Sequence, residues 1–131
     1  MEEETEEVEI REGYYGKGIV LKTKPQFKFG TSKLTEKSRK EDMKALADEI
    51  NSMDVKTLVI EGHTDSIGSH KVNDKISKQR AQELANVLKK EYGVKDKIGV
   101  IGLGKRVPVA TNQTKEGRAK NRRVEVIVIK K

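Results

Sequence analysis

The chain has 131 residues, of which 37% are charged and 34% hydrophobic, and it contains no cysteine. This length indicates one domain with a modest core beneath a heavily charged surface. The lack of cysteine excludes disulfides, thiolate catalysis and cysteine metal sites. No apolar run approaches the roughly 20 residues of a membrane-spanning helix, and the acidic start at residues 1–4 is unlike a signal peptide. We therefore expect a soluble chain, which a longer exported protein could also contain as a domain.

The net charge of +7 is unevenly distributed along the chain. Residues 1–12 carry seven Glu against one Arg, a charge of −6, so the remaining chain carries +13. A body this basic favours an anionic partner such as nucleic acid, a membrane surface or an acidic polymer. A lysine-rich surface that merely keeps the protein soluble explains the same charge, and composition alone leaves both interpretations open.

The N-terminal segment, residues 1–18, is predicted to be an acidic arm followed by a glycine-rich turn, and to be partly disordered. Residues 19–131 are then expected to form the folded domain. Its first predicted element is a strand at 19–24, which Pro25 ends.

Two features predict the next part of the domain. Phe27 and Phe29 alternate with polar neighbours, so we expect both rings to face the core. Ser38 and Glu41 have the spacing of a capping box. The apolar residues that follow recur at helical spacing and predict a helix that runs to about residue 52.

The rest of the chain continues to alternate between strands and helices. The apolar pattern predicts a buried strand at 56–61, a helix at 77–93, a strand at 98–101, a short helix within 111–120 and a last strand at 124–129. This alternation implies crossover connections and helices packed on a sheet.

Two opposite charges stand at the junction of the strand at 56–61 with the next helix. Asp65 follows the strand directly, where open α/β sheets tend to place ligands, and Arg80 lies in the opening turn of the predicted helix. An Asp facing an ammonium and an Arg facing a carboxylate make charge-assisted hydrogen bonds. Together they could hold a zwitterionic amino acid centre. A structural Asp–Arg ion pair, or an Asp helix cap, fits the same spacing.

Two other motifs are incomplete. His63, Asp65 and His70 are ligand types for zinc, but a His-x-Asp pair is a common accident of sequence. Residues 99–105 satisfy most of a phosphate-binding loop, yet Arg106 stands where Ser or Thr should hold magnesium. We therefore expect no metal and no cofactor, and we expect the glycines to serve a bulge or turn after the third strand.

The segment 121–123 is basic, and Arg106 and Arg118 precede it in the sequence. It is either an anion-binding edge or a solvated basic rim. Nucleic acid is not expected as a partner, because five aromatic residues supply a poor base-stacking platform. No Ser lies in a nucleophile-elbow setting, so we do not expect an enzyme.

Together these residues resemble the OmpA-like C-terminal domain. This peptidoglycan-binding module is shared by outer-membrane porin-type proteins, peptidoglycan-associated lipoproteins and flagellar motor stator proteins. The resemblance runs from about residue 19 to 129, and Lys28 departs from it where many members carry Asp. It is carried by five stretches: Phe27–Leu34, Ile60–Asp65, Ile76–Ala81, Gly102–Gly104 and Gly117–Glu125.

The resemblance implies an α+β fold of the βαβαβ-type OmpA-like sandwich, with a mixed sheet and helices packed on one face. It also implies a ligand, the diamino acid of the peptidoglycan stem peptide, commonly diaminopimelate. By the match, Asp65 would take its ammonium and Arg80 its carboxylate. Three further residues would support the peptide by hydrogen bonds: Thr64, Asn73 and, in preference to Arg123, Arg122.

The implied function is non-covalent anchoring of the outer membrane or envelope to the cell wall. The domain would lie on the periplasmic face of the envelope, associated with the outer membrane through segments absent from this chain. The alternative is the periplasmic domain of a flagellar-stator-like protein, with wall binding coupled to a homodimer. The spacing after Gly68 is more similar to the porin and lipoprotein branches than to the stator branch.

Overall fold

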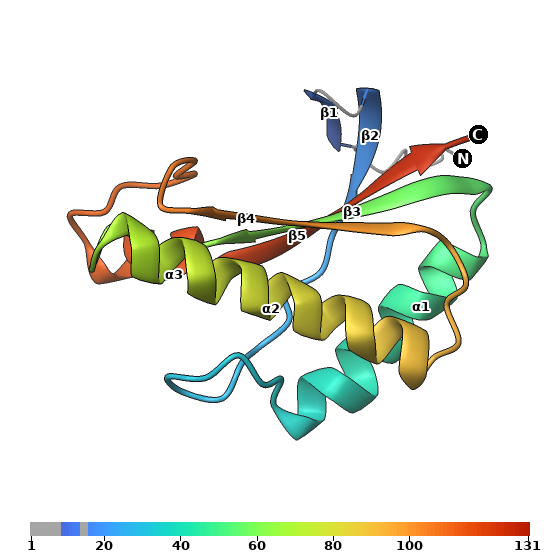
Figure 1. Ribbon diagram of the computed structural model, residues 1–131, viewed down its shortest axis with the longest axis horizontal. Coiled ribbons are helices and arrows are strands. Elements are labelled where there is room, and N and C mark those ends of the chain that lie inside the picture. The colour runs from blue at the N-terminus through green and yellow to red at the C-terminus, as the bar shows by residue number, and fades with distance from the viewer. Residues whose placement is uncertain (1–8, 14–15) are drawn as a thin grey trace, which may run out of the picture.

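The computed structural model describes residues 9–13 and 16–131. These residues form a five-stranded mixed sheet in the order β1-β2-β5-β3-β4 (Figure 1). Strand β3 pairs parallel with β4 and antiparallel with β5, and β5 pairs antiparallel with β2. The predicted α+β fold with a mixed sheet is confirmed. In chain order the elements are β1 (Glu9–Gly13), β2 (Gly16–Leu21), η1 (Ser38–Asp42), α1 (Met43–Asn51), β3 (Val55–His63), α2 (His70–Lys90), β4 (Ile98–Gly104), α3 (Lys115–Asn121) and β5 (Arg123–Lys130).

Helices α1 and α2 lie on the same side of the sheet (Figure 1). Successive strand side chains point to opposite faces, so the buried Leu58 and Ile60 of β3 share the face that the helices cover. On the helix side, the predicted apolar faces are buried as expected, and Tyr92 packs at their edge. Their buried members are Met43, Leu46, Ala47 and Ile50 of α1 and Ala81, Leu84, Ala85 and Leu88 of α2. None of the helices in the described part of the chain has the length and apolar character needed to cross a bilayer.

The N-terminal half of α2 approaches the sheet very closely, because glycines face it. A Cβ added to Gly62 of β3 would lie 1.9 Å from the carbonyl oxygen of Ser77, and one on Gly102 of β4 would lie 2.7 Å from the Lys78 nitrogen. The register shifts at Gly62/His63, where Gly102 and Gly104 are the β4 partners. The expected bulge near these glycines is therefore confirmed, and their packing against α2 explains why side chains are absent there.

Helix α2 begins at His70, seven residues before the predicted start at Ser77. The hydroxyl of Ser69 accepts a hydrogen bond from the Val72 amide at 3.2 Å and caps the helix. The prediction failed because the buried positions of the first two turns, Asn73 and Ser77, are polar and leave no apolar period.

The predicted capping box at Ser38 is wrong. The helical segment begins at residue 36, and Thr35 Oγ1 accepts a hydrogen bond from the Ser38 amide at 3.2 Å. Ser38 is buried, and its hydroxyl accepts from the Gln26 amide and donates to Asp42 Oδ2, both at 2.7 Å. It therefore ties the preceding loop to η1 and does not start the helix.

The prediction for the two phenylalanines is half right. Phe27 forms a bridge with Leu34 and packs against the core, whereas Phe29 is fully exposed. Phe29 lies outside the core because residues 28–33 form a tight outward turn, closed by a 2.8 Å bond from the Lys28 amide to the Lys33 carbonyl.

The N-terminal segment also differs from the prediction. Residues 9–13, expected in an arm, form β1 and pair with β2. Strand β2 starts at residue 16, not 19, so it crosses the predicted boundary between arm and domain. Residues 1–8 and 14–15, on which the rest of the predicted arm falls, lie outside the described residues.

Candidate ligand-binding site

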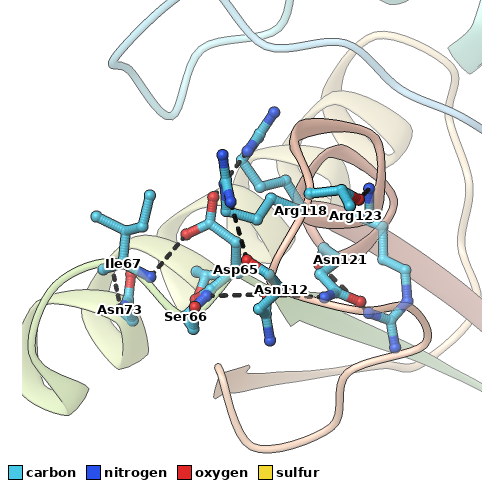
Figure 2. Close-up of polar contacts among 12 residues, drawn as sticks. Asp65, Ser66, Ile67, Asn73, Asn112, Arg118, Asn121 and Arg123 are labelled. Carbon is cyan, nitrogen blue, oxygen red and sulfur yellow. Dashed lines mark hydrogen bonds and ion pairs between the residues drawn. The ribbon is translucent and has the colours of Figure 1, made fainter.

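Asp65 lies directly beyond the carboxyl end of β3, next to the end of β4. The Thr64 amide donates to the Gly104 carbonyl at 2.8 Å and fixes the chain there. The Asp65 carboxylate is largely buried: Oδ1 accepts from the Ile67 amide at 3.0 Å, and Oδ2 accepts from Arg122 Nη1 at 2.7 Å. Figure 2 shows the carboxylate turned toward the Ile67 backbone. The turn and Arg122 thus hold this negative charge in a fixed position just beyond β3.

The turn that follows Asp65 is held by side chains that the sequence analysis assigned to the ligand. Asn73, buried on the first turn of α2, donates from Nδ2 to the Ile67 carbonyl at 2.8 Å (Figure 2). Thr64 donates from Oγ1 to the Asp65 carbonyl at 2.9 Å. Gly68 has a φ of +94°, a conformation that glycine adopts without strain. In this structure Thr64 and Asn73 therefore position the turn, and their contact with a ligand stays a prediction.

Arg80 lies half-buried on α2 and is held from the loop before α1. Its Nε donates to the Thr31 carbonyl at 3.2 Å, and its guanidinium carbon lies 5.1 Å from the centroid of the Phe27 ring. Burial lowers the pKa of Arg80, the positive charge of Arg122 lowers it further, and the negative charge of Asp65 opposes both. These three charges therefore form one electrostatic cluster.

Within the described residues, Asp65 makes its ion pair with Arg122 and makes none with Arg80. The interpretation of Asp65 and Arg80 as a direct structural pair is thus wrong. Neighbouring Arg123 turns elsewhere: its Nε bonds Glu125 Oε1 at 2.7 Å and its Nη2 donates to the Val107 carbonyl at 3.0 Å. Of the two arginines that the sequence offered, Arg122 is the one that reaches Asp65.

Asn121 and Asn112 form a hydrogen-bonded brace beside the turn that follows Asp65. The charge pattern of the sequence did not reveal this brace, because both side chains are uncharged amides. Asn121 is fully buried; its Oδ1 accepts from the Val109 and Ala110 amides at 2.8 and 2.9 Å. Its Nδ2 donates to Asn112 Oδ1 at 2.9 Å, and that oxygen also accepts from the Ser66 amide at 3.2 Å (Figure 2). The brace thereby connects the end of α3 to the turn beside Asp65.

The cluster has an excess of positive charge that suits a zwitterion. Two guanidinium groups lie around one carboxylate. Burial and the positive charge of Arg122 both lower the pKa of Arg80, and a ligand carboxylate would offset both effects. A carboxylate offers about four lone-pair sites, and Asp65 uses two in the bonds above. It can therefore accept hydrogen bonds from an ammonium without releasing Arg122.

A groove adjoins Arg122, and none of its lining residues comes from α2. Its volume is about 960 Å³, and residues 20–26 and 119–120 with 122–125 line it. Neither Asp65 nor Arg80 lines this groove, so the charge cluster lies beside it and shares Arg122 with it.

The sequence comparisons agree with this architecture. The profile of the OmpA family matches residues 26–122. Outer membrane porin F of Pseudomonas aeruginosa is 44% identical over 104 residues, which are 79% of this chain and 29% of the porin. The peptidoglycan-binding protein ArfA of Mycobacterium bovis is 41% identical over 88 residues, 67% of this chain and 27% of ArfA. The chain thus spans less than a third of either relative's length.

A solved structure confirms the fold. The periplasmic domain of Helicobacter pylori MotB superposes with a TM-score of 0.74, over 86% of this chain and 83% of that domain. The two sequences are 23% identical, so this likeness concerns the fold alone.

Proposed function

Because this chain belongs to the OmpA family, we propose that it binds peptidoglycan non-covalently, without altering it, and so anchors the cell envelope to the wall. The observation that carries the proposal is the cluster of Asp65, Arg80 and Arg122 at the end of β3. The relationship to a protein named for peptidoglycan binding supports it. The proposed role is that of a binding module and not of an enzyme.

The proposed ligand is the free amino acid centre of the stem-peptide diamino acid, such as diaminopimelate. Asp65 would accept hydrogen bonds from the ammonium, and Arg80 would donate to the carboxylate. Hydrogen bonds to charged groups contribute about 1.5–3 kcal/mol each. Both protein groups are held by other contacts before a ligand arrives, which lowers the entropy lost on binding.

The remaining predicted residues have supporting roles in this proposal. Arg122 would hold Asp65 in place and share the ligand carboxylate with Arg80. Thr64 and Asn73 would maintain the turn that presents Asp65. The groove beside Arg122 would give the rest of the stem peptide room to leave the site.

The proposed location is the periplasmic face of the envelope, in association with the outer membrane. Any membrane attachment would come from segments outside these 131 residues. The wall is a multivalent polymer, so modest affinity at one site suffices when many copies bind one sacculus.

Co-sedimentation with purified sacculi tests the site directly. Asp65→Asn and Arg80→Gln should each weaken binding by about tenfold or more, since each removes a hydrogen-bonded charge. The chain offers a matched control in Asp74 and Arg106, an ion pair of the same residue types that is partly exposed nearby. Asp74→Asn and Arg106→Gln change the net charge identically and should bind as the wild type does.

Circular dichroism should show that all four variants fold. Titration with free muropeptides that carry or lack the diamino acid's second amino acid centre then tests the ligand itself. Equal sacculus binding by all four variants and the wild type would mean that the basic surface holds the wall non-specifically, and the site assignment would be withdrawn.

The second candidate function is that of a stator-like periplasmic domain, because the chain shares its fold with the MotB domain. That role couples wall binding to a homodimer, so sedimentation velocity of this domain alone and with muropeptide separates the two. A dimer that forms on ligand binding, together with one membrane span carrying an Asp in the full-length gene, would favour the stator. A monomer under both conditions would favour the simple anchor.

A further inference from the structure

A second polar cluster lies on the sheet face opposite α1 and α2. Glu61 and His63 are two residues apart on β3 and therefore share a face, and Glu125 is the direct β5 partner of Glu61. His63 is 2% exposed, and neither of its ring nitrogens has a hydrogen-bond partner among the described residues. A buried imidazole without partners is costly, so its surroundings require an explanation.

The carboxylates surround one nitrogen of this ring. His63 Nε2 lies 3.5 Å from Glu61 Oε1 and 3.8 Å from Glu125 Oε2, and the three ligand atoms lie within 4.8 Å of one another. A neutral imidazole with its proton on Nδ1 would point the Nε2 lone pair at both carboxylates and would be repelled by them. A cation between the three atoms converts that repulsion into attraction.

Arg123 holds one of the two carboxylates in position. Its Nε donates to Glu125 Oε1 at 2.7 Å, and the other oxygen, Oε2, lies 3.8 Å from His63 Nε2. Either a proton on Nε2 or a metal ion could lie between the ring and the carboxylates.

The separations favour a metal ion over a proton. A charge-assisted N–H···O bond is about 2.7–2.9 Å long, which is shorter than both separations at Nε2. Ligands at bond lengths of about 2.1 Å in a tetrahedral site lie about 3.4 Å apart. The separations of 3.5 and 3.8 Å are close to that value.

We propose that His63 Nε2, Glu61 and Glu125 bind a divalent first-row transition metal ion, for which Zn²⁺ is the reference. One imidazole with two carboxylates suits Zn²⁺ and its neighbours in the series and leaves a fourth position for water. The ion would join β3 to β5 two residues before Asp65 and three after Arg122, and so stiffen the strand ends that carry the peptidoglycan site.

Calorimetric titration of the full chain with ZnCl₂ tests the proposal, with Co²⁺ absorption as an independent readout of coordination. The wild type should bind one ion, and its melting temperature should rise by several degrees with excess Zn²⁺. Glu61→Gln keeps the shape of the side chain and should weaken binding by about tenfold or more. His63→Gln should abolish it, whereas the matched control His70→Gln changes an exposed histidine and should bind as the wild type does.

Two outcomes would overturn the proposal. One is the absence of binding by the wild type at millimolar Zn²⁺. The other is binding that survives Glu61→Gln and disappears in His70→Gln, which would place the ion on the surface. If His63→Gln does not fold, the ¹⁵N shift of His63 Nε2 in the wild type decides, because a metal-bound nitrogen shifts on adding Zn²⁺. If the ¹⁵N shift of His63 Nε2 changes with pH but not on adding Zn²⁺, the cluster binds a proton and the metal site is refuted.

Discussion

Replacing Gly62 with Ala tests whether the close approach of α2 to β3 holds the site together. The added Cβ would lie 1.9 Å from the Ser77 carbonyl oxygen and 2.6 Å from its carbonyl carbon. Both are backbone atoms within a helix, so no rotamer change can relieve the contact. Either α2 or β3 must move.

The expected cost follows from two opposing terms. Overpacking a closely packed contact costs about 1–3 kcal/mol, and an unyielding backbone favours the upper end. Alanine restricts the unfolded chain and returns about 0.4–1 kcal/mol. We therefore expect Gly62→Ala to lower the free energy of unfolding by about 2 kcal/mol. Gly99→Ala is the matched control on β4, because its nearest neighbour would be 3.9 Å away, and it should be neutral or slightly stabilising.

Urea denaturation followed by circular dichroism gives both free energies and shows through the slope whether unfolding stays two-state. A shift of α2 also moves Arg80 relative to Asp65, so Gly62→Ala should weaken sacculus binding even where it is fully folded. Stabilities of the two variants within about 0.5 kcal/mol of each other would refute the argument that this contact is tight.

Two further predictions concern stability. Asn121→Ala removes four hydrogen bonds from a fully buried side chain and should cost about 2–4 kcal/mol in urea unfolding, whereas Asn86→Ala on the exposed face of α2 should cost less than about 0.5. A comparable loss in both variants would contradict the brace. Hydrogen bonds from Arg106 and Arg39 lower the pKa of Asp74 and of Glu91. Because the folded-state pKa lies below the unfolded one, their stabilisation is present above about pH 4 and is lost as pH falls through the folded pKa. Thermal melts should therefore show a shallower acid loss in Asp74→Asn and Glu91→Gln than in the wild type, and identical pH profiles would argue against these pairs.

The helices and the buried strand were predictable because apolar spacing reports directly which face is buried. The face of α1 and the stripe of α2 from Ala81 to Leu88 follow the helical period and are buried. The run at Leu58–Ile60 marked β3 in the same way. The motif around Asp65 predicted where the charge cluster lies, since a charge just beyond a buried strand lies at the end of that strand.

Features that depend on approach between distant segments were not predictable. The start of α2 was missed because Asn73 and Ser77 are buried by fitting against a turn and a glycine, which leaves no hydrophobic signal. The exposed position of Phe29 depends on a turn closed between residues 28 and 33. The partner of Asp65 is Arg122, 57 positions away, and the sequence could place the two side by side only through the family resemblance.

The proposed metal cluster of Glu61, His63 and Glu125 shows why strand register matters when a sequence is searched for metal ligands. Strand β3 ends at His63, and Asp65 lies in the turn beyond it, where its carboxylate accepts hydrogen bonds from the Ile67 amide and from Arg122. Alternation along β3 places His63 on the same face as Glu61, and antiparallel pairing places Glu125 opposite Glu61, 64 positions later. The partners of a strand residue are its second neighbours and the residues across the ladder, not the residues beside it. A search for metal ligands in a β-rich sequence should therefore follow predicted registers, since short sequence spacing detects ligands on helices and loops and overlooks those on neighbouring strands.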